Sequence, residues 1–451
     1  MGLISMQEVV LKNDDNDTNI FFSHFLRMLK NEFKIQTEDL QSWGELIDLF
    51  RKKKSVFDSP LILVIDEFDR LPFNIINNLL SLFREMYLNR KSYLLHGLAL
   101  VGIHSVFEGE NTSGSPFNVQ RYLHIEHLSF GEVKEIFDQY QKESSQRIEP
   151  DVIENLYKKT QGQPGLTGWF GELLTDKYNQ NRHKTIDIEM WNHVYVNACE
   201  IEHNDIVQNI VSKAMSEYQS NIINLFTDSN IHFSLSNDWC NYMLMHGIIR
   251  YDDVEENNMS EYICRFSSPF IQTRLFHAFI DRIKENKEHA IHAFDPQVSL
   301  EDVTTNSNLN VPALLKHYKS YLARLKDSGL NTIQNQRRIE AIGHFHLYHW
   351  IKMALGIQRS IRPEFPIDSG TLYLHIEYEA KKGIIEIKSF TTLREAILAR
   401  KQAAAYAKQS GYSDITIAMF APITDEHVIN QLSVNESING INVHVVVIGQ
   451  G

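Results

Sequence analysis

The sequence predicts a multidomain protein of mixed α/β class. The chain has 451 residues, which is enough for about three domains. Residues 61–65 form an uninterrupted apolar run that ends in Asp66 and Glu67, a pattern typical of a parallel strand buried on both faces. From about residue 335 onward, apolar strand-like runs alternate with amphipathic helical patterns. These observations predict a parallel sheet in the first part of the chain and a separate α/β domain in the last part.

The first part resembles AAA-like ATPases of the signal-transducing STAND type. The strand at residues 61–69 resembles a Walker B strand, a second apolar strand follows at 98–102, and two glycine-proline loops follow at 114–119 and 160–165. The resemblance implies that Asp66 holds a magnesium ion and that Glu67 polarises the attacking water. It also implies that the turn at residues 162–164 lies in a lid near the nucleotide. The alternative for these residues is a core strand followed by ordinary polar loops.

The P-loop of such ATPases is missing from this sequence. No Gly-x-x-x-x-Gly-Lys-Ser/Thr motif occurs, and the chain contains no Gly-Lys dipeptide at all. A P-loop wraps phosphates with backbone N–H groups and brings its lysine to the terminal phosphates. We therefore expect the chain to begin after the P-loop, with Asp66 and Glu67 as a vestigial Walker B pair. ATP is then not a cofactor of this chain alone, although a partner chain could supply the missing half.

The sequence pattern in the middle of the chain predicts a small unit of helices and a β-hairpin. Helical patterns cover residues 202–225 and 237–246, Gly247 ends the second helix, and two alternating runs at 248–251 and 262–266 flank a polar turn. This order resembles the winged-helix domains that follow STAND-type ATPase cores. The turn is acidic and would repel phosphate, so a packing role is expected rather than DNA binding. Residues 284–310 are polar and predict a linker.

The most informative pattern lies at residues 383–388, where Glu386 and Lys388 interrupt an apolar strand. Because side chains alternate along a strand, these two charges share one face, while Ile385 and Ile387 point to the other face and into a core. Burying such a pair is costly unless a metal ion and a phosphate compensate it. The alternative is a surface ion pair on a half-exposed strand.

The surroundings of this strand resemble the PD-(D/E)XK nuclease superfamily over residues 335–450, especially nuclease domains appended to AAA-like ATPases. A helix from Arg337 to about Leu355 precedes an extended segment at 361–366 and a strand at 371–378; a helix at 393–408 and strands at 415–420 and 443–448 follow. The resemblance implies cleavage of phosphodiesters with Mg²⁺ or Mn²⁺. It implies that Glu386 binds the metal and Lys388 orients or deprotonates the water. Glu340, Gln402 and Tyr406 would support the site from the flanking helices.

One residue departs from that pattern. Tyr373 stands where the superfamily has a metal-binding aspartate, and tyrosine is a poor ligand for a hard cation. Asp368, just before the turn, is the first alternative ligand beside Glu386, and Glu377 is a further one about 13 Å along the strand. Two functions therefore remain open: a metal-dependent nuclease, or a degenerate nuclease and ATPase fold that serves as a scaffold for protein or nucleic acid.

Composition and charge indicate which partner and which cellular compartment to expect. The net charge is −13, but residues 330–451 carry 12 Lys and Arg against 11 Asp and Glu. The last part is thus the only region that does not repel a phosphate backbone, and nucleic acid is the expected partner there. Cys199, Cys240 and Cys264 lie far apart, which excludes a disulfide framework and fits a reducing cytoplasm.

We expect no membrane contact, because the chain has neither a long apolar run nor a signal sequence. The sequence also leaves open whether the chain binds a protein partner or forms a homo-oligomer. The expected fold is a partial P-loop-NTPase-like parallel sheet, a winged helix and a restriction-endonuclease-like α/β domain, with Ile385, Ile387, Ile417 and Val445 in the core of the last. The expected domains are an AAA-like core with its lid (1–175), a winged helix (176–283), a linker and helix (284–330) and a nuclease-like domain (331–451).

Overall fold

The computed structural model describes most of the chain, in fourteen ranges. They are residues 1–9, 17–102, 126–226, 228, 230–256, 259–285, 301–304, 309–327, 336–355, 360–366, 371–378, 380–390, 392–423 and 425–449. The predicted loop at 114–119 and Asp368 lie outside these ranges, as does most of the predicted linker at 284–310. The chain divides into two compact units, Met1–Ile125 and Glu126–Gly451, and each is described by itself. Within the described ranges, no helix combines the length and the apolar character that a membrane span requires.

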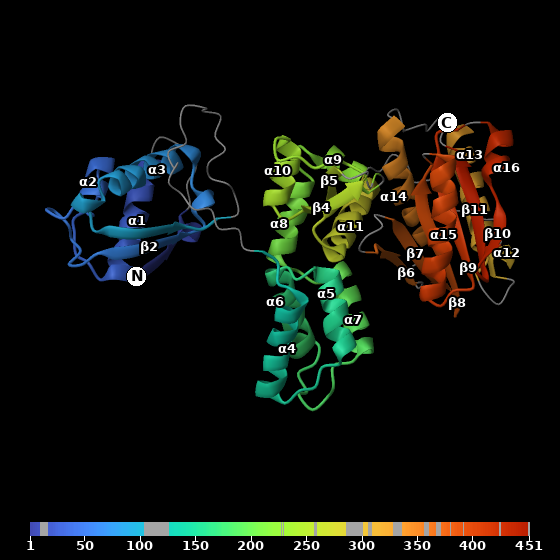
Figure 1. Ribbon diagram of the computed structural model, residues 1–451, viewed down its shortest axis with the longest axis horizontal. Coiled ribbons are helices and arrows are strands. Elements are labelled where there is room, and N and C mark those ends of the chain that lie inside the picture. The colour runs from blue at the N-terminus through green and yellow to red at the C-terminus, as the bar shows by residue number, and fades with distance from the viewer. Residues whose placement is uncertain are drawn as a thin grey trace. The chain divides into compact units, whose positions relative to one another are not determined.

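The first unit is built on a three-stranded parallel sheet with the strand order β1-β2-β3 (Figure 1). Its elements are β1 (Gly2–Ser5), α1 (Asp17–Phe33), α2 (Trp43–Asp48), β2 (Leu61–Asp66), α3 (Phe73–Leu88) and β3 (Leu95–Leu100). The strand predicted at 61–69 is confirmed as β2, but the expectation that both faces are buried is wrong: Leu63 and Ile65 are fully buried, whereas Ile62 on the other face is 42% exposed. The second predicted strand, expected at 98–102, begins three residues earlier. Parallel neighbours need crossover connections, and the helices between the strands provide them.

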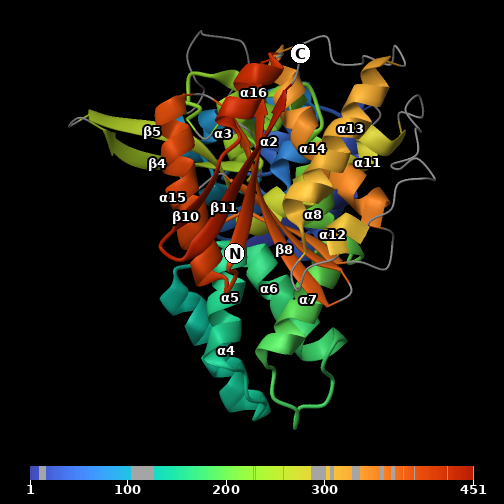
Figure 2. The same cartoon turned by 90° about the vertical axis from the view of Figure 1, so that its right-hand side faces the viewer.

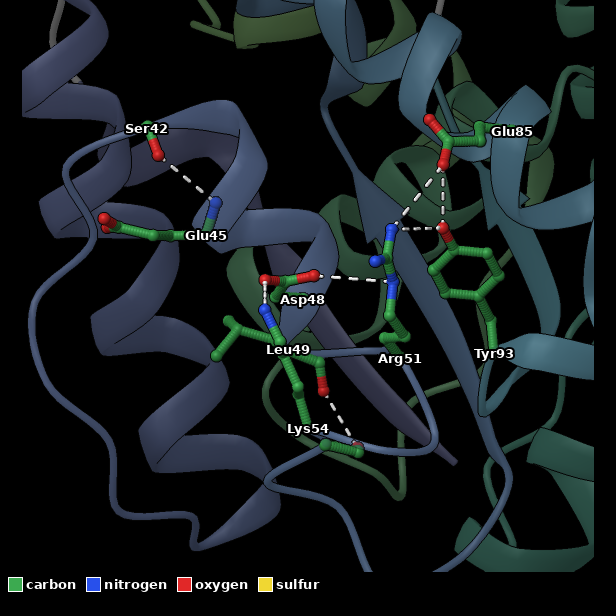
Figure 3. Close-up of polar contacts among 9 residues, drawn as sticks. Ser42, Glu45, Asp48, Leu49, Arg51, Lys54, Glu85 and Tyr93 are labelled. Atoms are coloured by element: carbon green, nitrogen blue, oxygen red, sulfur yellow. Dashed lines mark hydrogen bonds and ion pairs between the residues drawn. The ribbon is translucent and has the colours of Figure 1, made fainter.

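A polar cluster ties the end of α2 to α3 and to the segment before β3 (Figure 3). Asp48 pairs with Lys54 at 2.6 Å and with Arg51 at 3.4 Å. The Arg51 guanidinium donates to the Tyr93 hydroxyl, which in turn donates to Glu85 at 2.8 Å. Burial raises the pKa of Tyr93, and the hydrogen bond to Glu85 makes a second, smaller contribution in the same direction. The cluster therefore fixes the two chain segments that lead into β2 and β3.

The second unit begins with a group of helices that contains the predicted glycine-proline turn. These helices are α4 (Phe130–Ser144), α5 (Pro150–Thr160), α6 (Pro164–Glu172) and α7 (Ile188–Glu200). The turn joins α5 to α6, and Gly162 has a φ of +69°. A Cβ there would lie 1.8 Å from the carbonyl oxygen of Leu128, so only glycine fits. Residues 126–175, assigned above to the ATPase core and lid, belong to the second of the two compact units.

The next elements are α8 (Asp205–Ala214), α9 (Gln219–Leu225), α10 (Asp238–Met245), β4 (Ile249–Glu256), β5 (Met259–Phe266) and α11 (Pro269–Glu285). The single helix predicted at 202–225 is wrong, because α8 ends at Ala214 and Ser216 caps its last turn by donating to the Lys213 carbonyl. The predicted second helix is confirmed, and Gly247 follows it with a φ of +67°. β4 and β5 pair antiparallel, and His232 forms an additional bridge to Ile263.

The last part of the chain folds around a six-stranded mixed sheet with the order β10-β11-β9-β8-β7-β6. The strands are β6 (Ser360–Glu364), β7 (Leu372–Tyr378), β8 (Lys381–Ser389), β9 (Asp414–Ala421), β10 (Asn435–Ile438) and β11 (Ile441–Gly449). β6, β7 and β8 form an antiparallel meander, whereas β8, β9 and β11 are parallel. The sequence analysis did not predict β10, which is only four residues long.

Helices cover both faces of this sheet (Figures 1 and 2). They are α13 (Val311–Asp327) and α14 (Gln336–Leu355) on one face, α15 (Leu393–Gln409) and α16 (Glu426–Leu432) on the other; a short helix, α12 (Glu301–Thr304), precedes α13. All four predicted core positions are buried: Ile385, Ile387, Ile417 and Val445. The alternative of a half-exposed strand is wrong for β8, because both of its faces are covered.

Candidate functional site

Three residues that face α15 form a row across neighbouring strands. Glu364 on β6 is in register with Tyr373 on β7, and Tyr373 is in register with Glu386 on β8. Side chains in register on adjacent strands share a face and lie about 5 Å apart at Cβ. The sheet therefore places two carboxyl groups on either side of one phenol. Gln402 and Tyr406 reach the same row from α15.

The charged pair predicted from the sequence is assembled on this face. The Lys388 ammonium lies 3.3 Å from Glu386 Oε1 and 3.3 Å from Gln402 Oε1. Glu386 is fully buried, and neither of its carboxylate oxygens makes a hydrogen bond of good geometry. Burial raises the pKa of Glu386 to about 7, and the nearby Lys388 charge opposes this rise only in part. A carboxyl group that titrates near neutrality is thus enclosed between β8 and α15.

Tyr373 occupies the position next to Glu386 where the nuclease pattern has an acid. Its side chain is buried, and its ring stacks on Tyr406 with centroids 3.9 Å apart. Burial and the neighbouring Glu386 carboxylate raise the pKa of Tyr373, so the phenol stays neutral at physiological pH. A neutral phenol cannot replace a carboxylate as a ligand for a hard cation.

The described residues do not complete a metal site. No group of three or more His, Cys, Asp and Glu residues in the described part could hold a metal ion. Asp368 lies outside the described residues, and Glu340 lies on α14 but its side chain is likewise not described. Glu377 pairs with Arg362 at 3.9 Å. It lies opposite Lys382, whereas Tyr373, four residues earlier on β7, lies opposite Glu386. The described carboxylates of the row are therefore Glu386 and Glu364, and Glu364 is already paired with His375 and Lys159, which leaves Glu386 to Mg²⁺ or Mn²⁺.

A second polar network, which the sequence analysis missed, adjoins the row. The Glu364 carboxylate lies 3.0 Å from His375 Nε2 and 3.3 Å from the Lys159 ammonium on α5. His375 also contacts the hydroxyls of Tyr406 and Tyr412. Burial alone would raise the pKa of Glu364, but His375 and Lys159 outweigh it and hold that pKa well below its usual range. No motif joins Lys159 to Glu364; the one available signal was that His375 shares the strand parity of Tyr373.

The outer side of α15 carries a line of exposed cations. Arg394, Lys401 and Lys408 are all exposed and are spaced by seven residues, which is about two helical turns. They therefore lie on one side of the helix, along about 21 Å of its length. The opposite side of α15 presents alanines to the sheet.

In the first unit, Asp66 and Glu67 lie at the carboxyl end of β2, the edge where α/β sheets bind ligands. The Glu67 backbone is left-handed, with a φ of +53°, and its N–H donates to Asp66 Oδ1 at 2.9 Å. The Glu67 carboxylate pairs with Arg70 at 3.6 Å. The two predicted residues are thus adjacent at the expected edge.

Comparison with known proteins finds a family match that begins in the first part of the chain. Residues 49–182 match the model of the AAA-like domain family. The chain is also similar to a solved structure of the RuvB Holliday junction branch migration motor of Thermotoga maritima, with 15% identity, 49% of this chain and 72% of that chain covered, and a TM-score of 0.28. No curated protein matches the sequence. Residues 49–182, which include β2, its terminal acids and the turn at Gly162, are therefore similar to AAA-like domains.

Proposed function

We propose that the protein joins its AAA-like domain to a C-terminal nuclease-like domain that binds nucleic acid without cutting it. The observation that carries this proposal is the register of Tyr373 with Glu386. A hard divalent cation needs several oxygen ligands, and a single carboxylate leaves it weakly held. The stacked pair of Tyr373 and Tyr406 fills the space beside Glu386 with neutral aromatic rings.

Nucleic acid is the favoured partner because of the charges on α15. Arg394, Lys401 and Lys408 form one exposed line of cations, and residues 330–451 have a net charge of +1, against −14 for residues 1–329. Such a line suits the regularly spaced phosphates of a nucleic acid backbone, which are bound through charge and without sequence specificity.

We expect the purified protein to bind single- and double-stranded DNA or RNA and to leave it intact in Mg²⁺ and Mn²⁺. Reversing the three charges (Arg394→Glu, Lys401→Glu, Lys408→Glu) should weaken binding at least about tenfold and reduce its salt dependence. Fluorescence anisotropy measures the binding, and denaturing gels measure cleavage. The matched control reverses three exposed lysines elsewhere in the same unit: Lys134, Lys142 and Lys184.

Two outcomes would contradict the proposal. Equal binding by the α15 variant and the control would remove nucleic acid as the partner of this surface. Cleavage by the wild type that is lost in Glu386→Ala and in the presence of a chelator would establish the active nuclease instead. The variant Tyr373→Asp offers a gain-of-function test, because it restores a second carboxylate beside Glu386. We expect it to acquire stabilisation by Mn²⁺ that the wild type lacks.

The active nuclease remains a second candidate, and one observation favours it. Lys388 lies 3.3 Å from both Glu386 and Gln402, and burial brings the pKa of Glu386 to about 7. Groups with perturbed pKa values cluster at functional sites. This function requires a second carboxylate ligand, for which Asp368 is the first choice and Glu340 the second. A loss of cleavage on the order of 10²-fold in Lys388→Ala would support it.

We infer that residues 205–266 form a winged helix with a packing role. The order of α8, α9, the bridging residue His232, α10 and the β4–β5 hairpin supports this assignment. The hairpin arginines do not face outward as free charges, because Arg250 and Arg265 both pair with Asp252. The acidic turn would further weaken any contact with phosphate.

For the AAA-like domain, we predict that the purified chain does not hydrolyse ATP above the level of an Asp66→Ala variant. The reason is chemical: the 451 residues contain no Gly-Lys pair to bring a lysine to the terminal phosphates. Steady-state release of phosphate measures the rate. A rate that clearly exceeds the Asp66→Ala background would show that other residues replace the P-loop.

A further inference from the structure

A groove of about 710 Å³ lies at the amino ends of β8, β9 and β11, beside the start of α13. Its volume falls within the range of small-molecule sites, which is about 300–1,000 Å³. Such sites are mostly apolar, but much of this lining is polar. The polar lining residues include Asn310, Lys382, Ser410, Asp414, Thr416 and His444. The groove therefore suits a ligand that forms several hydrogen bonds.

The groove is separate from the row around Glu386. Thr416 is in register with Ile385, whereas Glu386 is in register with Ile417. Because successive side chains of a strand point to opposite faces, Thr416 faces the α13 side of the sheet and Glu386 faces the α15 side. No residue of the row lines the groove. A ligand in the groove is thus independent of the proposed nucleic-acid binding.

Two neighbouring side chains of the lining offer hydrogen bonds to a ligand. Thr416 on β9 and His444 on β11 are in register, so they lie about 5 Å apart on one face of the sheet. Thr416 is 2% exposed, and its hydroxyl makes no hydrogen bond to any residue that the structure describes. His444 Nδ1 lies 2.9 Å from Asn435 Oδ1 and donates to it, so Nε2 of the neutral ring is an acceptor.

The charges of the lining offset each other. Among the described lining residues, Lys382 is the cation and Asp414 the carboxylate, so the groove favours neither an anion nor a cation. Asp414 accepts hydrogen bonds from the Ser413 hydroxyl and the Asn442 amide, which fix the orientation of the carboxylate. A carboxylate can accept about four hydrogen bonds, so a ligand hydroxyl can share it.

We propose that this groove binds a neutral carbohydrate. A sugar hydroxyl both donates and accepts, so it can donate to Asp414 or to His444 Nε2 and accept from the Thr416 hydroxyl. The Tyr412 hydroxyl lies 3.0 Å from His375 Nδ1, so this residue offers its ring to the groove. The apolar C–H face of a pyranose packs against such a ring. The ligand needs no net charge, because the charges of the lining are already balanced.

The test uses the full chain with glucose, galactose, mannose and N-acetylglucosamine, and with the disaccharides maltose and cellobiose. Isothermal titration calorimetry and ligand-observed NMR provide the readouts. We expect at least one of these sugars to bind saturably. Thr416→Val, which keeps the size of the side chain and removes the hydroxyl, should weaken that sugar about three- to tenfold. Asp414→Asn should weaken it about tenfold or more, because a hydrogen bond to a charged group is stronger.

Thr167→Val is the matched control and should bind like the wild type. Thr167 on α6 is also a buried threonine without a hydrogen-bond partner for its hydroxyl, but it does not line the groove. Circular dichroism establishes that each variant is folded, and if Thr416→Val is not, Asp414→Asn decides alone.

Three outcomes would overturn the proposal. The first is that none of the sugars binds. The second is that glucose 6-phosphate or glycine binds more tightly than every neutral sugar, which would make the ligand an anion or a zwitterion. The third is that a sugar binds the wild type, Thr416→Val and Asp414→Asn equally well, which would place its site elsewhere on the chain.

Discussion

Replacing Glu386 by glutamine should stabilise the C-terminal unit at pH 8 by about 2–3 kcal/mol. Burial raises the folded-state pKa of this carboxyl from 4.5 to about 7. Between these values the folded state binds more protons than the unfolded state, so stability falls as pH rises through the window of about 4.5–7. Above pH 7 the wild type holds a buried charge, at a cost of roughly 1.4 kcal/mol per pKa unit. Glutamine has the same shape and no charge.

Urea unfolding at pH 8 and at pH 4.5 measures this effect. At pH 4.5 the wild-type carboxyl is mostly protonated when folded, so the advantage of Glu386→Gln should nearly vanish. Glu135→Gln, at an exposed position on α4, is the control and should change stability by less than about 0.5 kcal/mol at either pH. A Glu386→Gln variant that is equally stable as or less stable than the wild type at pH 8 would contradict the prediction.

The burial of Glu386 also changes the effect that removal of Lys388 should have on stability. A pair on a half-exposed strand would contribute little, and removing its lysine would leave folding nearly intact. In the folded chain, Lys388 is the one cation within ion-pair distance of a fully buried carboxylate among the described residues. Lys388→Ala should therefore destabilise the protein as well as alter any chemistry, because it leaves that charge uncompensated. Activity assays of this variant need a folding control.

Replacing Gly162 by alanine should destabilise the C-terminal unit by about 3 kcal/mol. The residue has a φ of +69°, a region that side chains with a Cβ rarely adopt. The new Cβ would also lie 1.8 Å from the Leu128 carbonyl oxygen, which is backbone and cannot rotate away. That carbonyl belongs to a segment already fixed by the hydrogen bond from Leu128 N–H to Gly162 O. Strain of this kind costs about 1–3 kcal/mol, and the overlap adds to it.

Gly168, six residues further along, is the matched control. It lies within α6, is exposed, and a Cβ there would meet nothing within 4 Å. Gly168→Ala should therefore stabilise the unit by about 0.5–1 kcal/mol, through the better helix propensity of alanine. Urea midpoints of the two variants should move in opposite directions. If both variants were destabilised equally, the geometry of the turn would not be the cause.

Local pattern was sufficient to predict most strands of the two sheets. The apolar run that ends at Asp66 and the alternation around Glu386 identify buried strands without any knowledge of partners, because side-chain direction follows from the strand repeat. The shared face of Glu386 and Lys388 follows from the same repeat. Residue identity alone also identified Tyr373 as the departure from the nuclease pattern. The break between α8 and α9 was missed, because the apolar spacing continues across it.

The tertiary structure determines the neighbours, the burial and the pKa values of these residues. Only the pairing of β6, β7 and β8 places Glu364, Tyr373 and Glu386 in one row, and only α15 buries Glu386 completely. The ion pair between Lys159 and Glu364 joins residues 205 positions apart, and the neighbouring positions of Thr416 and His444 depend on the pairing of β9 with β11. A shifted pKa, an unsatisfied acceptor and a groove all depend on residues that are close in space but distant in sequence. Strand periodicity in the sequence carries the direction of a side chain, but it contains no information about which distant residues surround it.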